Sequence, residues 1–124
     1  TTPWSKETFL KTLENRSISF VITSDGQVIA FCIANKVLDE CHLQNIAVAE
    51  ELRGRGIGTF ILNILLKRAK ITDLYTVLLE VRESNKIARK FYQDNGFEEI
   101  STRKDYYKTK EGRENAVIMR LEVV

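Results

Sequence analysis

A series of short apolar runs, rich in β-branched and aromatic residues, occupies residues 18 to 48. Two of these runs, Ile18 to Thr23 and Gln27 to Val37, flank Ser24-Asp25-Gly26, which is typical of a tight hairpin turn. After Leu38-Asp39-Glu40 turns the chain, a third run extends from Cys41 to Val48. The pattern predicts three antiparallel strands in succession.

The apolar period then changes from that of strands to that of helices. We predict an amphipathic helix from Gly58 to Lys70, whose last turn carries cations that suit the helix dipole. We interpret these cations as part of a solvated face. The predicted buried face consists of Phe60, Ile61, Ile64, Leu65 and Ala69.

A strand and a second helix follow. Tyr75 to Val81 is a nearly continuous apolar run, as expected of a strand that is covered on both faces. Ser84 or Asn85 is expected to cap the next helix, and Gly96 to follow its C-terminus. A spacing of four residues puts two pairs on the predicted buried side of this helix, Ile87 with Phe91 and Ala88 with Tyr92.

Both ends of the chain add further predicted elements. Ser5 is a good N-cap for a short helix from Lys6 to about Asn15. Two strands near the other end, Phe97 to Arg103 and Ala116 to Val123, are joined by the polar loop Lys104 to Asn115. The order of helix, three strands, helix, strand, helix and two strands predicts a mixed α/β sheet with helices on its faces.

Composition limits the classes of protein that fit. The length of 124 residues indicates a single domain, residues 1–124, and 44% hydrophobic with 29% charged residues is ordinary for a globular protein. A net charge of +2 is too small to indicate direct nucleic-acid binding. Cys32 and Cys41 form no CxxC motif and His42 is the only histidine, so no metal site is predicted. Without a membrane-span pattern or a signal peptide, we expect a cytoplasmic protein with reduced thiols and no membrane contact.

A glycine-rich basic turn, Arg53-Gly54-Arg55-Gly56-Ile57-Gly58, separates the third predicted strand from the first amphipathic helix. Glycines allow the backbone to approach a ligand closely, and both the helix N-terminus and the arginines attract anions. The turn matches neither the Walker loop nor the GxGxxG motif of dinucleotide folds. It predicts a phosphate or pyrophosphate site, although a solvated basic loop fits these six residues equally well.

Two residues later in the chain are candidates for proton transfer. Glu80 lies within an otherwise apolar strand, where burial of an unpaired carboxylate would cost several kcal/mol. It should therefore lie at an edge, a bulge or a cleft. Tyr92 lies on the predicted buried side of the second helix and could converge with Glu80 beside the phosphate loop. Taken singly, an edge-strand glutamate and a core tyrosine remain alternative interpretations.

The ordered set of motifs resembles the GCN5-related N-acetyltransferase (GNAT) superfamily, and within it the enzymes that acetylate the alanine of ribosomal proteins. The acetyl-CoA loop of that superfamily, Arg/Gln-x-x-Gly-x-Gly/Ala, matches Arg53 to Gly58 here. The resemblance extends from Pro3 nearly to the end of the chain. Its other motifs are Pro3-Trp4-Ser5, Asn45 to Val48, Leu79 to Arg82, Ser84-Asn85, Phe91-Tyr92, Asn95 to Phe97, Asp105 to Tyr107 and Gly112 to Met119.

The resemblance implies a fold and a set of roles. It implies a mostly antiparallel sheet that splays between the strands ending near Val48 and near Glu80, leaving a cleft for the cosubstrate acetyl-CoA. Glu80 would be the general base and Tyr92 the general acid. Asn85 would be a second coenzyme contact, with helix capping as its alternative role. The remaining coenzyme contacts would be the backbone of Ile46, Ala47 and Val48 and the loop residues Arg53, Gly54, Arg55, Gly56, Ile57, Gly58 and Thr59.

The expected acceptor is the N-terminal α-amine of a protein, an alanine of a ribosomal protein as the resemblance implies. At neutral pH an α-amine with a pKa near ~7.7–8.0 is partly neutral, whereas under ~0.1% of lysine amines are. Tyr106 and Tyr107 could flank the first residues of such a peptide, or be exposed tyrosines without a ligand. Acetylation of a lysine or a small amine, and a non-catalytic acetyl-CoA binding module, remain alternatives.

The superfamily also has a strand and a helix before the segment that matches Pro3, and this sequence does not show them. We therefore expect Ile18 to Thr23 to lie at an edge of the sheet. Because open edges recruit partners, self-association or lowered stability is expected, while the oligomeric state stays open.

Overall fold

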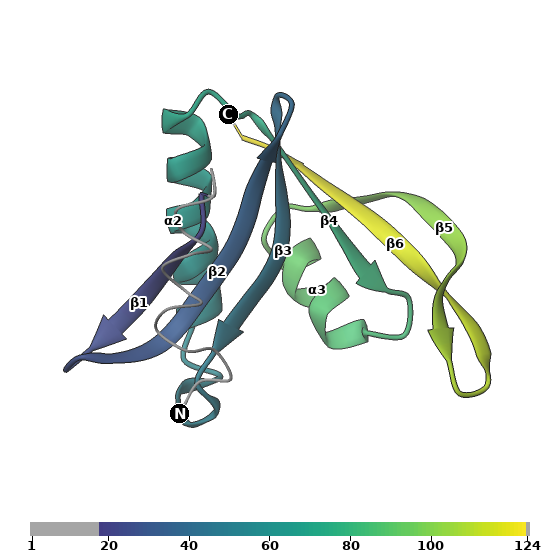
Figure 1. Cartoon of the computed structure of the whole chain (residues 1–124), viewed down its shortest axis with the longest axis horizontal. Coiled ribbons are helices and arrows are strands. Elements are labelled where there is room, and N and C mark those ends of the chain that lie inside the picture. Colours follow the sequence, from purple (N-terminus) through teal and green to yellow (C-terminus); the bar gives the residue numbers. More distant parts are fainter. Residues whose placement is uncertain (1–17, 124) are drawn as a thin grey trace.

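The computed structural model describes residues 18–123, which form one six-stranded sheet with helices (Figure 1). The strand order is β1-β2-β3-β4-β6-β5. The predicted helix from Lys6 to Asn15 and its cap Ser5 lie outside the described residues. The elements are β1 (Phe20–Ser24), β2 (Gln27–Val37), β3 (Glu40–Val48), η1 (Glu50–Leu52), α2 (Ile57–Ile71), β4 (Thr76–Arg82), α3 (Lys86–Asp94), β5 (Glu98–Thr109) and β6 (Gly112–Glu122).

The first three strands are antiparallel neighbours, as predicted. The turn between β1 and β2 places Asp25 at φ 52° and Gly26 at φ 79°, and two positive φ values are what a type I′ hairpin turn requires. β1 starts at Phe20 and lies at one end of the described sheet. Ile18 precedes the strand, but its amide still donates to the carbonyl of Ala34 at 3.2 Å.

β3 and β4 are parallel and pair over only two residues, Cys41 with Val77 and His42 with Leu78. Beyond these pairs the strands diverge, which Figure 1 shows as the opening between β3 and β4 below their common upper end. A bulge at Gln44 interrupts the β2–β3 register within the diverging part of β3. The predicted splayed, mostly antiparallel sheet is therefore confirmed.

The main core lies on the sheet face that α2 and α3 cover. Buried residues of α2 and half-buried residues of α3 pack in one cluster with residues of the inner strands. Helices on both faces were predicted; the structure confirms this for the face that α2 and α3 share, and the remaining predicted helix lies outside the described residues. Within residues 18–123 no helix is long and apolar enough to cross a membrane. The cluster includes Cys32, Leu43, Ile61, Leu65, Leu79, Val81, Ala88, Phe91 and Met119.

Three predictions of burial were wrong. Phe60 is 56% exposed and Leu62 is buried in its place, because the stripe of α2 that faces the sheet passes through Ile61, Leu62 and Leu65. Ile87, in the first turn of α3, is 86% exposed. β4 is not covered on both faces: it alternates between buried and more exposed positions, and Glu80 lies on the more exposed face.

The polar loop predicted between residues 104 and 115 is instead the outer half of a long β5–β6 hairpin. The strands pair as far as Thr109 with Gly112. A register shift between Arg103 and Tyr107, with Asp105 at φ 54°, bends β5. Almost every residue of β5 is exposed, so no apolar alternation marks this part of the hairpin as strand.

Candidate active site

The glycine-basic turn, residues 53–58, leads directly into the N-terminus of α2. Gly54 and Gly56 have φ values of 78° and 77°, and a Cβ atom at either position would meet no atom of residues 18–123 within 4 Å. Gly56 is the N-cap and supplies no side-chain hydrogen bond, so the first amides of the helix have no capping side chain. Arg53 Nε donates to the carbonyl of Val48 at 3.2 Å, which fixes the turn to the end of β3. The arrangement suits an anion.

Gly58 differs from the other two glycines of the turn. It lies within α2, and a Cβ there would come within 3.2 Å of the Phe91 ring of α3. The missing side chain allows α3 to pack against the first turn of α2. The turn is therefore tied through Gly58 to the helix that carries Tyr92.

The backbone of β3 leaves hydrogen-bonding groups open beside β4. The Ala49 amide donates to the Ile29 carbonyl of β2 at 2.8 Å. Because successive residues of a strand point their backbone groups to opposite sides, those of Ile46 and Val48 point towards β4. β4 has already diverged there, and Arg53 takes the Val48 carbonyl. Ala47 lies two residues before Ala49 along the chain, so its backbone groups point towards β2 and not to the opening.

Tyr92 lies on the helix-covered side of the sheet. Its ring makes edge contacts with Phe91 and Phe97, at centroid distances of 5.1 and 5.4 Å. Burial, reinforced by the nearby Cys32, raises the pKa of Tyr92 to about 12, so the phenol stays protonated at neutral pH. Among residues 18–123 its hydroxyl has no hydrogen-bond partner, yet it is not sealed in the core.

Glu80 lies on the opposite face of the sheet. It pairs across the ladder with Ile118 of β6, and Arg103 Nη1 of β5 donates to its Oε1 at 2.9 Å. No hydrogen bond or ion pair joins Glu80 to Tyr92 within the described residues. The two predicted proton-transfer residues therefore lie on opposite faces of the sheet, and the last β3–β4 pair, His42 with Leu78, comes before the level of Glu80.

The two predicted acceptor-binding tyrosines lie near Glu80. The rings of Tyr106 and Tyr107 meet edge to face at 5.1 Å. The Arg103 guanidinium lies 3.9 Å from the centre of the Tyr106 ring, and Arg82 lies 4.3 Å from that of Tyr107. Burial and then the charge of Glu80 raise the pKa of Tyr107. The hairpin thus brings Glu80, two arginines and both tyrosines together.

Asn85 has the capping role that was the alternative to coenzyme binding. Its Oδ1 accepts the Ala88 amide at 3.1 Å at the start of α3. The turn before it is held from β6, because Glu114 Oε1 accepts the Ser84 amide at 2.7 Å. Hydrogen bonds from the Ser84 side chain and then from its amide lower the pKa of Glu114.

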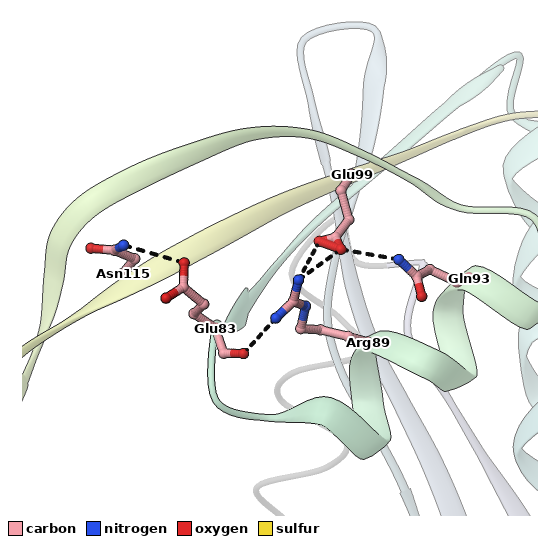
Figure 2. A network of polar contacts seen from close by, with 5 residues as sticks. All are labelled: Glu83, Arg89, Gln93, Glu99 and Asn115. Carbon is pink, nitrogen blue, oxygen red and sulfur yellow. Dashed lines mark hydrogen bonds and ion pairs between the residues drawn. The ribbon is translucent and has the colours of Figure 1, made fainter.

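Sequence reasoning missed a polar network that joins α3 to the neighbouring strands (Figure 2). Arg89 reaches in two directions, donating to the Glu83 carbonyl at 2.7 Å and to both Glu99 oxygens at 2.8 and 2.9 Å. Gln93 also donates to Glu99, and Asn115 to the Glu83 carboxylate. The network joins side chains from different elements, and the one sequence signal for it was the position of Arg89 one helical turn after Asn85. The network lines an open pocket beside the α3 N-terminus.

Comparisons with known proteins agree with this geometry. Residues 1–97 match the model of the acetyltransferase (GNAT) family. The chain belongs to the GNAT family. It is 40% identical over 121 residues to the [ribosomal protein bS18]-alanine N-acetyltransferase of Escherichia coli strain K12, covering 98% of this chain and 82% of that protein. The predicted resemblance is confirmed.

Solved GNAT structures share the fold. The crystal structure of the ribosomal-protein-S18-alanine N-acetyltransferase from Escherichia coli superposes with a TM-score of 0.81 at 39% identity, covering 99% of this chain and 79% of that one. A GNAT acetyltransferase from Elizabethkingia anophelis with acetyl-CoA bound gives 0.77 at 23% identity, covering 95% and 83%. In residues 18–123 of the present structure no group of three or more His, Cys, Asp or Glu side chains could hold a metal ion.

Proposed function

We propose that this chain transfers the acetyl group of acetyl-CoA to an N-terminal α-amine, that of the alanine of a ribosomal protein such as bS18. The observation that carries the proposal is the 40% identity to a [ribosomal protein bS18]-alanine N-acetyltransferase over 98% of the chain. Because the likeness spans the turn, the opening and the hairpin together, it concerns the acceptor side as well as the coenzyme side.

The uncovered N-terminus of α2 supports acetyl-CoA as the donor. Among the described residues no atom lies within 4 Å of a Cβ at Gly54 or Gly56, and the adjacent amides and arginines would hold the pyrophosphate. The open backbone groups of Ile46 and Val48 would bind the amide-bearing pantetheine arm in the manner of an added strand. Acetyl-CoA supplies a thioester whose carbonyl carbon accepts the amine and whose sulfur departs.

Glu80 and Tyr92 would handle the protons from the two faces of the opening. Glu80, directly or through one water, would take the proton that the amine loses as its nitrogen bonds to the acetyl carbon. Tyr92 would donate its phenolic proton to the sulfur as the carbon–sulfur bond breaks, and then regain a proton from solvent. A partly buried phenol that is protonated at neutral pH and has no partner in residues 18–123 is free to make that donation.

The acceptor peptide would lie between the β5–β6 hairpin and β4. The rings of Tyr106 and Tyr107, which meet edge to face, present apolar surface beside Glu80. They would hold the first residues of the peptide so that its amine meets the carboxylate. Such positioning lowers the barrier by avoiding an entropy cost at the moment of reaction.

The test is mass spectrometry of peptides after incubation with acetyl-CoA. One peptide carries the N-terminal sequence of bS18 with a free alanine, and its match is blocked at the α-amine but keeps a free lysine. We expect acetylation of the first and little of the second. Faster acetylation of the lysine peptide would refute the N-terminal assignment, and acetyl-CoA binding without any transfer would indicate a binding module.

A further inference from the structure

Glu80 is paired with a cation from within the chain itself. Arg103 Nη1 lies 2.9 Å from Oε1, with the side chains 52% and 35% exposed for Arg103 and Glu80. No hydrogen bond engages Oε2 among residues 18–123. One oxygen of the candidate base is therefore held, and the other has no hydrogen-bond partner in this part of the chain.

Arg103 is held in this position by its own surroundings. Its guanidinium stacks on Tyr106. Ala116 of β6 lies opposite both Arg103 and Arg82 in the ladders, and it is completely buried beside these long side chains. A small residue between them allows both guanidiniums to lie over this part of the sheet. The ion pair with Glu80 is thus part of a fixed cluster.

Three other carboxylates on this face, those of Glu40, Glu114 and Glu122, have partners of their own. Glu114 accepts from Arg82 at 3.5 Å and from the Ser84 amide. His42 of β3 and Arg120 of β6 both pair with Leu78, which precedes Glu80 by two residues in β4. His42 contacts the Glu40 carboxylate and Arg120 contacts the Glu122 carboxylate, each at 3.4 Å. An incoming amine therefore meets Glu80 with two guanidiniums beside it. The charged and titratable groups on the strands around Glu80 include His42, Arg82, Glu98, Arg103, Asp105, Tyr106, Tyr107, Glu114 and Arg120.

We infer that Arg103 is a specificity-determining residue: as the internal counter-ion of Glu80, it keeps protonated amines out of the acceptor site. An ammonium group gains little from a carboxylate that is already paired, and the guanidiniums repel it. A neutral amine meets neither penalty. Since under ~0.1% of lysine side chains are neutral at pH 7, such a site discriminates against lysine while it admits an α-amine. The inference rests on the proposed function and specifies its acceptor.

The direct test uses the α-amine-blocked lysine peptide as an ammonium probe. Its binding is measured by calorimetry, and as competitive inhibition of alanine-peptide acetylation at pH 7. In Arg103→Gln we expect it to bind about two- to fivefold more tightly, the range for a partly exposed ion pair. Arg103→Lys, which keeps the charge, should stay close to the parent. Lys108→Gln removes a cation from an exposed position of the same strand and serves as the control.

Steady-state kinetics distinguishes exclusion of ammonium groups by Arg103 from a role in which Arg103 only holds Glu80 in position. If Arg103 excludes ammonium, Arg103→Gln should bind more alanine peptide unproductively, so kcat and KM fall together and kcat/KM changes by less than about twofold. A fall in kcat/KM with unchanged probe binding would overturn the inference. A parent protein that binds acetyl-CoA without acetylating the alanine peptide would refute the proposed function, while the calorimetric comparison would still decide the role of Arg103.

Discussion

At the scale of single residues, burial raises the pKa of two cysteines and one tyrosine, but these residues are suited to different roles. Cys32 and Cys41 are fully buried, and burial raises the pKa of each thiol to about 12. The pKa of Tyr92 is also about 12. Unlike the two cysteines, Tyr92 is only partly buried against the core, and its hydroxyl has no hydrogen-bond partner in the described chain. The thiols are therefore suited to packing, whereas the phenol can meet a ligand.

Tyr92→Phe should leave the fold intact and slow acetyl transfer by the ~10²–10⁴-fold that one acid–base group contributes. The lost hydroxyl has no partner among residues 18–123, so the free energy of unfolding should change by less than about 1 kcal/mol. Coenzyme release followed with a thiol reagent measures the rate, and calorimetry the acetyl-CoA affinity. Tyr75→Phe, at an exposed tyrosine bonded to Asp73, is the matched control. A Tyr92 variant as fast as the parent would make Tyr92 a core residue only.

The buried thiols should make the fold sensitive to alkali. Their pKa is about 12 in the folded protein and 9.0 when unperturbed, so the folded state holds protons that the unfolded state loses. Their stabilising effect is complete below pH 9 and is lost as the pH rises towards 12. Each thiol should lower the free energy of unfolding by about 1.4 kcal/mol per pH unit in that window. Urea unfolding at pH 8, 9.5 and 10.5 measures the slope, and Cys41→Ala should reduce it by one thiol's share.

At the scale of elements, the contact between α2 and α3 joins the phosphate turn to the helix of Tyr92. Gly58→Ala would place a methyl group within 3.2 Å of Phe91. Overpacking of this kind costs about 1–3 kcal/mol, whereas alanine in a helix gains about 1 kcal/mol over glycine. We expect a net loss of stability with Phe91 present and a gain in a Phe91→Leu background. A double-mutant cycle by thermal unfolding checks this, and additive effects would show that the contact is unimportant.

The glycine-basic turn is tested by comparing two acetyl donors, acetyl-CoA and acetyl-pantetheine. Gly56→Ala puts a side chain into open space at φ 77° and so disturbs the uncovered helix N-terminus. We expect weaker binding of acetyl-CoA and unchanged binding of acetyl-pantetheine, which lacks the pyrophosphate. Equal losses for both donors in calorimetry would mean that the variant damages the whole opening and not a phosphate site.

Sequence patterns predicted those elements whose signal is local. The I′ turn at Asp25-Gly26 and the cap at Asn85 depend on neighbouring residues, and both were found where expected. The outer β5–β6 hairpin was missed because nearly all of β5 is exposed and its period is not apolar. The Arg103–Glu80 pair, 23 residues apart, depends on strand order and on a register shift that no local pattern encodes. The candidate residues were thus predictable one by one, but their partners were not.

At the scale of the whole molecule, the splay between β3 and β4 leaves a strand edge inside the sheet. If the pantetheine arm fills it, the exposed amides of Ile46 and Val48 gain partners when acetyl-CoA binds, whereas the Ala49 amide already donates to Ile29. Hydrogen exchange should therefore slow at Ile46 and Val48 by more than global stabilisation explains, and at Ala49 only by that global amount. At 100 times Kd that global term is about 2.7 kcal/mol. The Gly56→Ala variant at the same degree of saturation should show the same pattern, because it changes affinity and not the edge. Equal slowing at all three amides would show that the coenzyme stabilises the fold without pairing with β3.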